Sequence, residues 1–80
     1  MPLWTKAKTP PSQIPDHVVR RVQSLSMEDL VLWSDQAISQ TGRYMTLWQR
    51  THDAEHLSEA TIGAQVLMAI VDEISRRNSL

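Results

Sequence analysis

The sequence lacks the residues that many small proteins use to stabilise a fold. None of its 80 residues is a cysteine, which excludes disulfide bonds and thiolate metal sites. A chain of this length forms one domain at most and buries a smaller fraction of its surface than a larger domain does. Small domains otherwise rely on a metal or on oligomerisation. We therefore expect either a site built from histidine and carboxylate groups or assembly with another chain.

Glycine, phenylalanine and excess positive charge are also scarce. The only glycines are Gly42 and Gly63, too few for a glycine-rich phosphate loop, and phenylalanine is absent. Lysine plus arginine number 8 against 9 aspartate plus glutamate, a net charge of -1. A dedicated nucleic-acid binder usually carries a basic excess instead. No apolar run approaches the roughly 20 residues that span a bilayer, and no signal-peptide pattern is present. These absences predict a cytoplasmic protein without a membrane segment.

Residues 1–14 predict an extended, proline-rich arm. They hold three of the four prolines and both lysines, Lys6 and Lys8. Proline removes a backbone donor and restricts the preceding residue, so helix is disfavoured here. Leu3 and Trp4 are the bulky apolar pair near its start. The sequence leaves open whether Trp4 is ordered, and whether it docks on its own domain or on a partner.

Residues 15–80 predict a helical hairpin domain that begins with a short helix. Pro15 and Asp16 suit the first helical turn, where proline is tolerated and a negative charge is favourable. Val18, Val22 and Leu25 then recur on one helical face over about three turns.

A second, longer helix is expected from Met27 to Arg50. Ser26 is a good N-cap, with Asp29 three residues later as a weaker substitute for the Glu or Gln of a capping box. Leu25 and Leu30 match a hydrophobic staple across this start. Its apolar residues cover about half the circumference, more than the stripe of about 100° that one packing face needs. They are Met27, Leu30, Val31, Trp33, Ala37, Ile38, Tyr44, Met45 and Trp48.

A third helix is expected from Ala54 to Arg77. Its main apolar seam alternates steps of three and four residues, as in a heptad pattern. A second small ridge stands beside this seam. The seam comprises Leu57, Ala60, Ala64, Leu67, Val71 and Ile74, and the ridge comprises Ile62, Val66 and Ala69.

The two long helices therefore form an antiparallel hairpin with more apolar surface than one hairpin buries. Two such hairpins packed across a two-fold axis would form a four-helix bundle. We predict an all-α, small non-enzymatic interaction module, a homodimeric regulator or an accessory subunit of a larger complex. Its partner is itself or an unidentified protein. The predicted interaction residues are Trp33, Tyr44, Ile62 and Val66.

The stretch RTHDAEHLSEA, residues 50–60, carries the main alternative. His52 and His56 stand four apart, and with Glu55 they match the H-x-x-E-H pattern of inverted zinc peptidases. A helix start explains the same residues, because Asp53 is a good N-cap and Glu55 falls in the positive first turn. We favour the helix start and expect no catalytic residue, no cofactor and no metal. A metal-binding protein at His52–His56 is kept as an alternative hypothesis.

Nucleic-acid association is the other alternative. Arg20 and Arg21 form a basic pair on the short helix, and the lysines of the arm would add attraction to phosphate. Against it, the following helix begins Met27-Glu28-Asp29, which places acidic groups where a helix-turn-helix would meet phosphates. Such binding would weaken steeply with salt and require both arginines.

Overall fold

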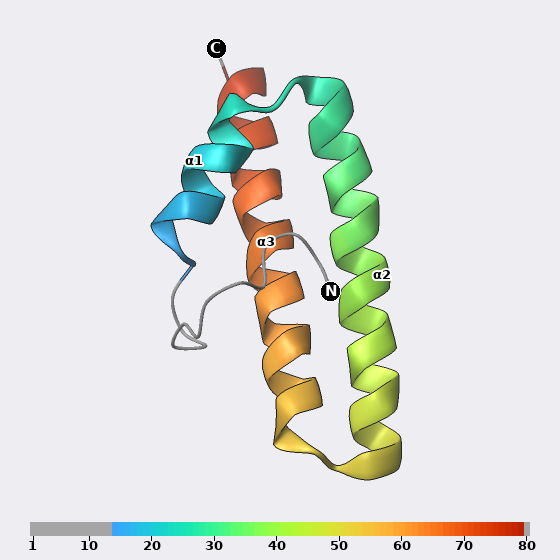
Figure 1. The fold of residues 1–80 in the computed structure, drawn as a ribbon. Coiled ribbons are helices and arrows are strands. Elements are labelled where there is room, and N and C mark those ends of the chain that lie inside the picture. Colours follow the sequence, from blue (N-terminus) through green and yellow to red (C-terminus); the bar gives the residue numbers. More distant parts are fainter. Residues whose placement is uncertain (1–13, 80) are drawn as a thin grey trace.

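A computed structural model describes residues 14–79, and within that range the chain is all-helical with no strand (Figure 1). The all-α prediction is confirmed, and the long helices end within one residue of their predicted limits. The predicted arm lies outside the described residues except for Ile14. The helices are α1 (Asp16–Ser24), α2 (Met27–Thr51) and α3 (Ala54–Asn78).

The predicted caps begin both long helices. The Ser26 hydroxyl accepts a hydrogen bond from the backbone N–H of Asp29 at 3.1 Å, and the Asp53 carboxylate accepts one from the N–H of Glu55 at 3.0 Å. Each bond satisfies a backbone donor that has no partner within the helix. His52 ends α2 in the left-handed conformation, with φ 55°. The connection between α2 and α3 is therefore only His52 and Asp53.

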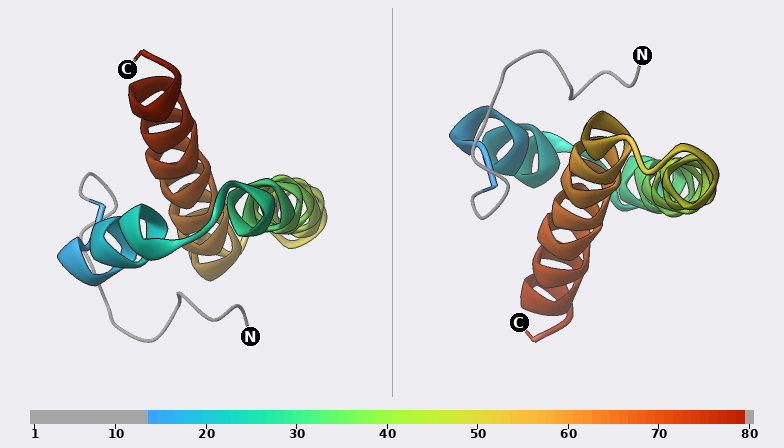
Figure 2. Two further views of the ribbon diagram at one scale, coloured as in Figure 1. Left: turned by 90° about the horizontal axis from the view of Figure 1, so that it is seen from above. Right: turned by 90° about the horizontal axis from the view of Figure 1, so that it is seen from below.

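The helices α2 and α3 lie antiparallel as a hairpin, while α1 packs against α3 (Figure 1). Figure 1 shows α1 beside only the half of α3 that leads to the C-terminus. Figure 2 shows α1 and α2 on different sides of α3, so α3 is the central element. The other half of α3 has no helical neighbour on its α1 side among residues 14–79.

The core joins all three helices around the second ridge of α3. Val66 is 1% exposed and Ala69 8%, and Ile62 packs partly buried against the same cluster. The predicted main seam is buried less completely, because Leu57, Ala64 and Val71 are exposed. The cause is α1, which covers the ridge and draws that side of α3 into the core. The cluster comprises Val18, Val22, Leu30, Ala37, Val66, Ala69 and Ile70.

A buried ion pair fastens the end of α1 to α3. Glu73 is only 4% exposed, and its carboxylate accepts hydrogen bonds from Arg76 and Arg77. Arg77 Nη2 also donates to the backbone carbonyl oxygens of Leu25, at 2.7 Å, and Gln23, at 3.2 Å. One guanidinium thus satisfies the carboxylate on α3 and the carbonyls at the end of α1.

Candidate interaction surface

Large hydrophobic side chains are exposed on both long helices. Six of them lie on one side of the hairpin and are between 39% and 61% exposed. None of the helices described within residues 14–79 is long and apolar enough to cross a membrane. We call these six residues the outer stripe: Met27, Val31 and Ile38 on α2, and Leu57, Met68 and Val71 on α3.

Helical spacing gathers the outer stripe on one side. On α2, Val31 and Ile38 follow Met27 by four and eleven residues, so the three share a flank beside the buried Leu30 and Ala37. On α3, Leu57, Met68 and Val71 share the flank opposite the ridge that α1 covers. Because the helices run antiparallel, both flanks face the same way, away from α1 (Figure 2). The stripe runs from the start of α2 to the α2–α3 turn.

Leu32 is an exposed hydrophobic residue that does not belong to the outer stripe. It is 59% exposed, as much as the stripe residues themselves. Its position, one residue after Val31, turns it about 100° further around α2. It therefore provides a matched comparison for any substitution in the stripe.

The interaction residues predicted from the sequence lie elsewhere. Val66 is in the core, and Trp33 and Ile62 are partly buried against it. Tyr44 is half-buried, with its ring stacked on His56 at a centroid distance of 6.0 Å. The hydrophobic arc predicted for α2 already contained Met27, Val31 and Ile38. The four residues predicted from the sequence lie on the side of the hairpin where α1 packs, and none belongs to the outer stripe.

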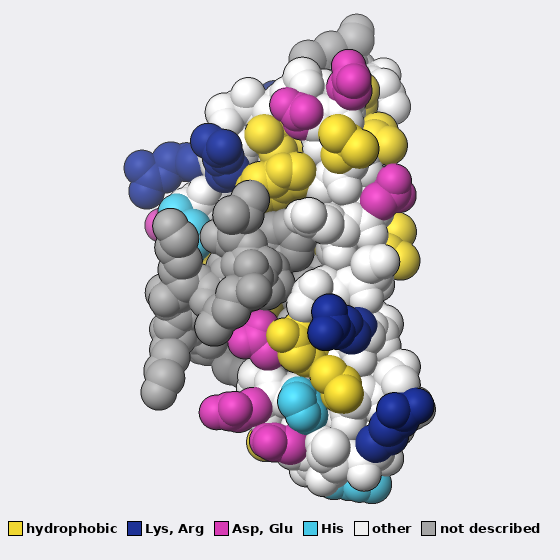
Figure 3. Space-filling view, turned by 45° about the vertical axis from the view of Figure 1, so that its right-hand side comes forward, with side chains coloured by type: hydrophobic (Ala, Val, Ile, Leu, Met, Phe, Trp, Pro, Cys, Tyr) yellow, Lys and Arg dark blue, Asp and Glu magenta, His cyan; other side chains and the backbone are white. Residues whose placement is uncertain are grey.

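The two histidines do not form the helical pair that a metal site needs. His52 lies outside both helices, with its ring 5.2 Å from that of Trp48, whereas His56 lies within α3 and stacks on Tyr44. No group of three or more potential metal ligands occurs among the described residues. Figure 3 shows acidic, histidine and arginine side chains gathered at the lower end of the molecule, where α2 turns into α3. The geometry supports the helix-start hypothesis for this stretch.

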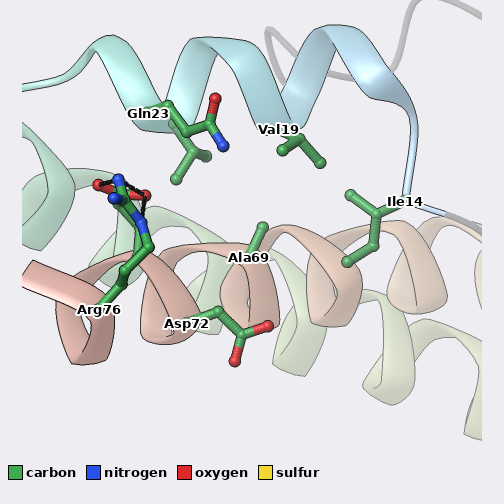
Figure 4. A pocket seen from close by; sticks show the side chains of 8 residues that line it. Ile14, Val19, Gln23, Ala69, Asp72 and Arg76 are labelled. Atoms are coloured by element: carbon green, nitrogen blue, oxygen red, sulfur yellow. Dashed lines mark hydrogen bonds and ion pairs between the residues drawn. The ribbon is translucent and has the colours of Figure 1, made fainter.

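A groove of about 200 Å³ lies between α1 and α3 (Figure 4). Val19 and Ala69 face each other across it, Ile14 lies at one end, and the Arg76–Glu73 pair lies at the other. The Arg76 guanidinium, and then that of Arg77, lowers the pKa of Glu73 by hydrogen bonding to its carboxylate. A carboxylate held ionised in this way does not donate a proton near neutral pH. The groove therefore offers apolar contacts and a fixed charge pair.

The basic pair of the nucleic-acid alternative lies on α1. Arg20 and Arg21 are both exposed, and Glu28 and Asp29 are exposed at the start of α2. The start of α2 is therefore acidic, as the sequence predicted. Within the helices α1 to α3, Arg20 and Arg21 remain a local pair and not part of a longer basic stripe.

Comparison with known proteins finds no match for the chain among protein-family models, curated proteins or solved structures.

Proposed function

We propose that the chain is a non-enzymatic protein-interaction module that forms a homodimer through its outer stripe. The observation that carries this proposal is the exposure of six large apolar side chains along one side of α2 and α3. Soluble proteins rarely expose a contiguous apolar patch of this kind unless it binds something. Burying it on another chain also supplies the additional core that an 80-residue protein without disulfides needs.

A second copy of the chain fits this surface because the stripe carries no charge. Four positions interspersed on the same flanks are small and uncharged, so another helix can approach closely there, and the charged Asp35 and Asp72 lie at the borders of the stripe. A two-fold axis would pair α2 and α3 with their copies and complete a four-helix bundle. The molecule measures 44 × 21 × 20 Å, so one long face is of the order of the ~800 Å² per partner typical of stable interfaces. The interspersed residues are Ser34, Thr61, Ala64 and Ser75.

The dimer would act as a regulator or an accessory subunit, through the surfaces that remain outside the bundle. Paired helices with their apolar faces buried present mainly polar flanks to a further partner. A role for Trp33, Tyr44 and Ile62 in contacts with a partner stays a prediction.

Sedimentation of three variants tests the proposal. Ile38→Asp and Val71→Asp each place a charge in the stripe without disturbing the core, so both should convert a dimer into a monomer of 9.1 kDa. Leu32→Asp adds the same charge at an equally exposed residue off the stripe and should leave the dimer intact. If Leu32→Asp dissociated the dimer as well as the other two, or if all three stayed dimeric, the stripe would not be the interface. Val66→Asp would be uninformative, because Val66 is in the core.

A further inference from the structure

The side of α3 that α1 covers continues beyond α1. Val66, Ala69 and Glu73 lie on this side and are buried beneath α1. Glu59 and Ile62 precede Val66 and Ala69 by seven residues each, two helical turns, so they extend the same side toward the α2–α3 turn. No helix among residues 14–79 lies over this part of α3 (Figure 1). The uncovered part of this side of α3 therefore begins level with the N-terminal end of α1.

Glu59 has an unsatisfied carboxylate oxygen at this surface. Its Oε2 atom is buried and has no hydrogen-bond partner among the residues that the structure describes. An ionised oxygen withdrawn from water without a donor is costly, and native structures supply one in the great majority of cases. We therefore expect a hydrogen-bond donor at Glu59 Oε2, and a positively charged donor would form the strongest bond. Arg76 and Arg77 are engaged more than three turns away at Glu73.

Half-buried apolar groups lie close to this anionic point. Ile62 lies one turn further along α3, and Tyr44, stacked on His56, lies on the flank of α2 opposite the outer stripe. Because α2 and α3 are antiparallel, that flank of α2 faces the same side as Glu59. We call Glu59, Ile62 and Tyr44 the inner surface. It fits a segment that combines a bulky apolar side chain with a nearby positive charge.

We propose that the N-terminal segment of the same chain, residues 1–13, docks on the inner surface. It holds the apolar pair Leu3 and Trp4 and the only lysines of the chain, Lys6 and Lys8. In this arrangement Trp4 covers the apolar groups, and a lysine ammonium donates to Glu59 Oε2. The segment thus supplies a positive charge for the Glu59 carboxylate and an apolar side chain for the half-buried apolar groups beside it.

Chain length and connectivity allow this docking. The segment joins the described chain at Ile14, which lines the groove beside Ala69 (Figure 4). From the level of Ala69 to Glu59 is ten residues of α3, about 15 Å at the helical rise. Thirteen extended residues reach up to about 43 Å. The docked segment lies on the side away from the outer stripe, so this inference is independent of the proposed dimer.

Paramagnetic broadening in the full-length protein tests the docking. The absence of cysteine allows one nitroxide label to be attached through Thr5→Cys. We expect loss of amide signal intensity at Glu59, Ile62 and Tyr44, with intensity retained at Met68 and Val71. Uniform intensities would overturn the proposal. A second experiment mixes ¹⁵N protein that carries no nitroxide with ¹⁴N protein that carries the nitroxide. Broadening in this mixture would also overturn the proposal, because the segment would then bind another copy of the chain.

The lysine contact is tested in the same labelled protein. Glu59→Gln, or Lys6→Gln with Lys8→Gln, should restore much of the lost intensity at Ile62, because the attraction between ammonium and carboxylate is removed. Glu55→Gln, an exposed carboxylate one turn earlier, should leave the broadening unchanged. Helix content from circular dichroism confirms that each variant is folded. Broadening that persists in both lysine-contact variants would overturn the assignment of a lysine to Glu59.

Discussion

Arg77 at the end of α3 donates a hydrogen bond to the backbone carbonyl oxygen of Leu25, 52 residues earlier, at 2.7 Å. Leu25 is the C-cap of α1, where carbonyl groups have no partner within the helix and the helix dipole is negative. A helix of nine residues is not stable alone. The position of α1 therefore depends on this contact together with the burial of Val18 and Val22.

Arg77→Lys should weaken the attachment of α1. A lysine ammonium cannot bridge Glu73 and Leu25 as the planar guanidinium does. We expect the free energy of unfolding to fall by about 1.5–3 kcal/mol, the usual range for hydrogen bonds to a charged group. Urea denaturation measures the loss, and hydrogen exchange of the α1 amides should accelerate. Arg76→Lys, at a side chain that is 61% exposed, should cost less. Equal losses in the two variants would contradict this account.

Glu73 should make stability depend on acid. Hydrogen bonds from Arg76 and Arg77 lower its pKa in the folded state below the ordinary value of 4.5. The contribution of Glu73 to the free energy of unfolding is therefore complete above the ordinary pKa of 4.5. It is lost as the pH falls through the lower pKa of the folded state. The melting temperature of the wild type should drop more than that of Glu73→Gln between about pH 5 and about pH 3. Asp72→Asn, at the exposed neighbour, should keep the wild-type slope; parallel slopes for wild type and Glu73→Gln would contradict the assignment.

The two glycines should respond oppositely to alanine. A Cβ atom at Gly63 would lie 2.5 Å from Thr41 Oγ1, which is itself bonded to the carbonyl oxygen of Ala37 at 2.7 Å. Gly63→Ala should therefore destabilise the hairpin by about 1–3 kcal/mol, as overpacking does. No neighbouring atom of residues 14–79 lies within 4 Å of a Cβ at Gly42, so Gly42→Ala should stabilise by up to about 1 kcal/mol. Thermal unfolding of the two variants measures both changes in stability. Changes of the same sign would contradict the predicted packing.

Removal of the Ser26 cap should destabilise the start of α2. Ser26→Ala leaves the backbone N–H of Asp29 without its acceptor, and such substitutions cost about 1 kcal/mol. Ser58→Ala, at an exposed residue inside α3, is the control and should be neutral or slightly stabilising. Denaturant titration measures both. A Ser26→Ala variant as stable as the control would show that the hydroxyl bond contributes nothing.

Helix positions and ends were predictable because their causes are local. The Ser26 and Asp53 caps act within three residues, and the turn at His52 separates two long periodic segments. The side of α3 that is buried was not predictable in this way. It depends on α1, which reaches α3 through contacts such as that of Arg77 with Leu25, more than 50 residues apart.

The candidate surface was only partly predictable for the same reason. Periodicity identified more apolar surface than one hairpin buries, and on α2 the surplus includes the exposed Met27, Val31 and Ile38. On α3 the prediction was reversed, because the ridge expected to remain uncovered is buried and Leu57 and Val71 of the expected seam are exposed. Which flank remained exposed depended on where α1 packed. Aromatic content alone favoured Trp33 and Tyr44, which are half-buried on the inner side.

Light scattering at several concentrations measures the mass of the unmodified protein in solution and so tests whether the chain dimerises. We expect a mass near twice 9.1 kDa that falls toward one chain only on strong dilution. A mass of 9.1 kDa at every concentration would contradict the proposed dimer, because the outer stripe would then remain exposed without a second copy.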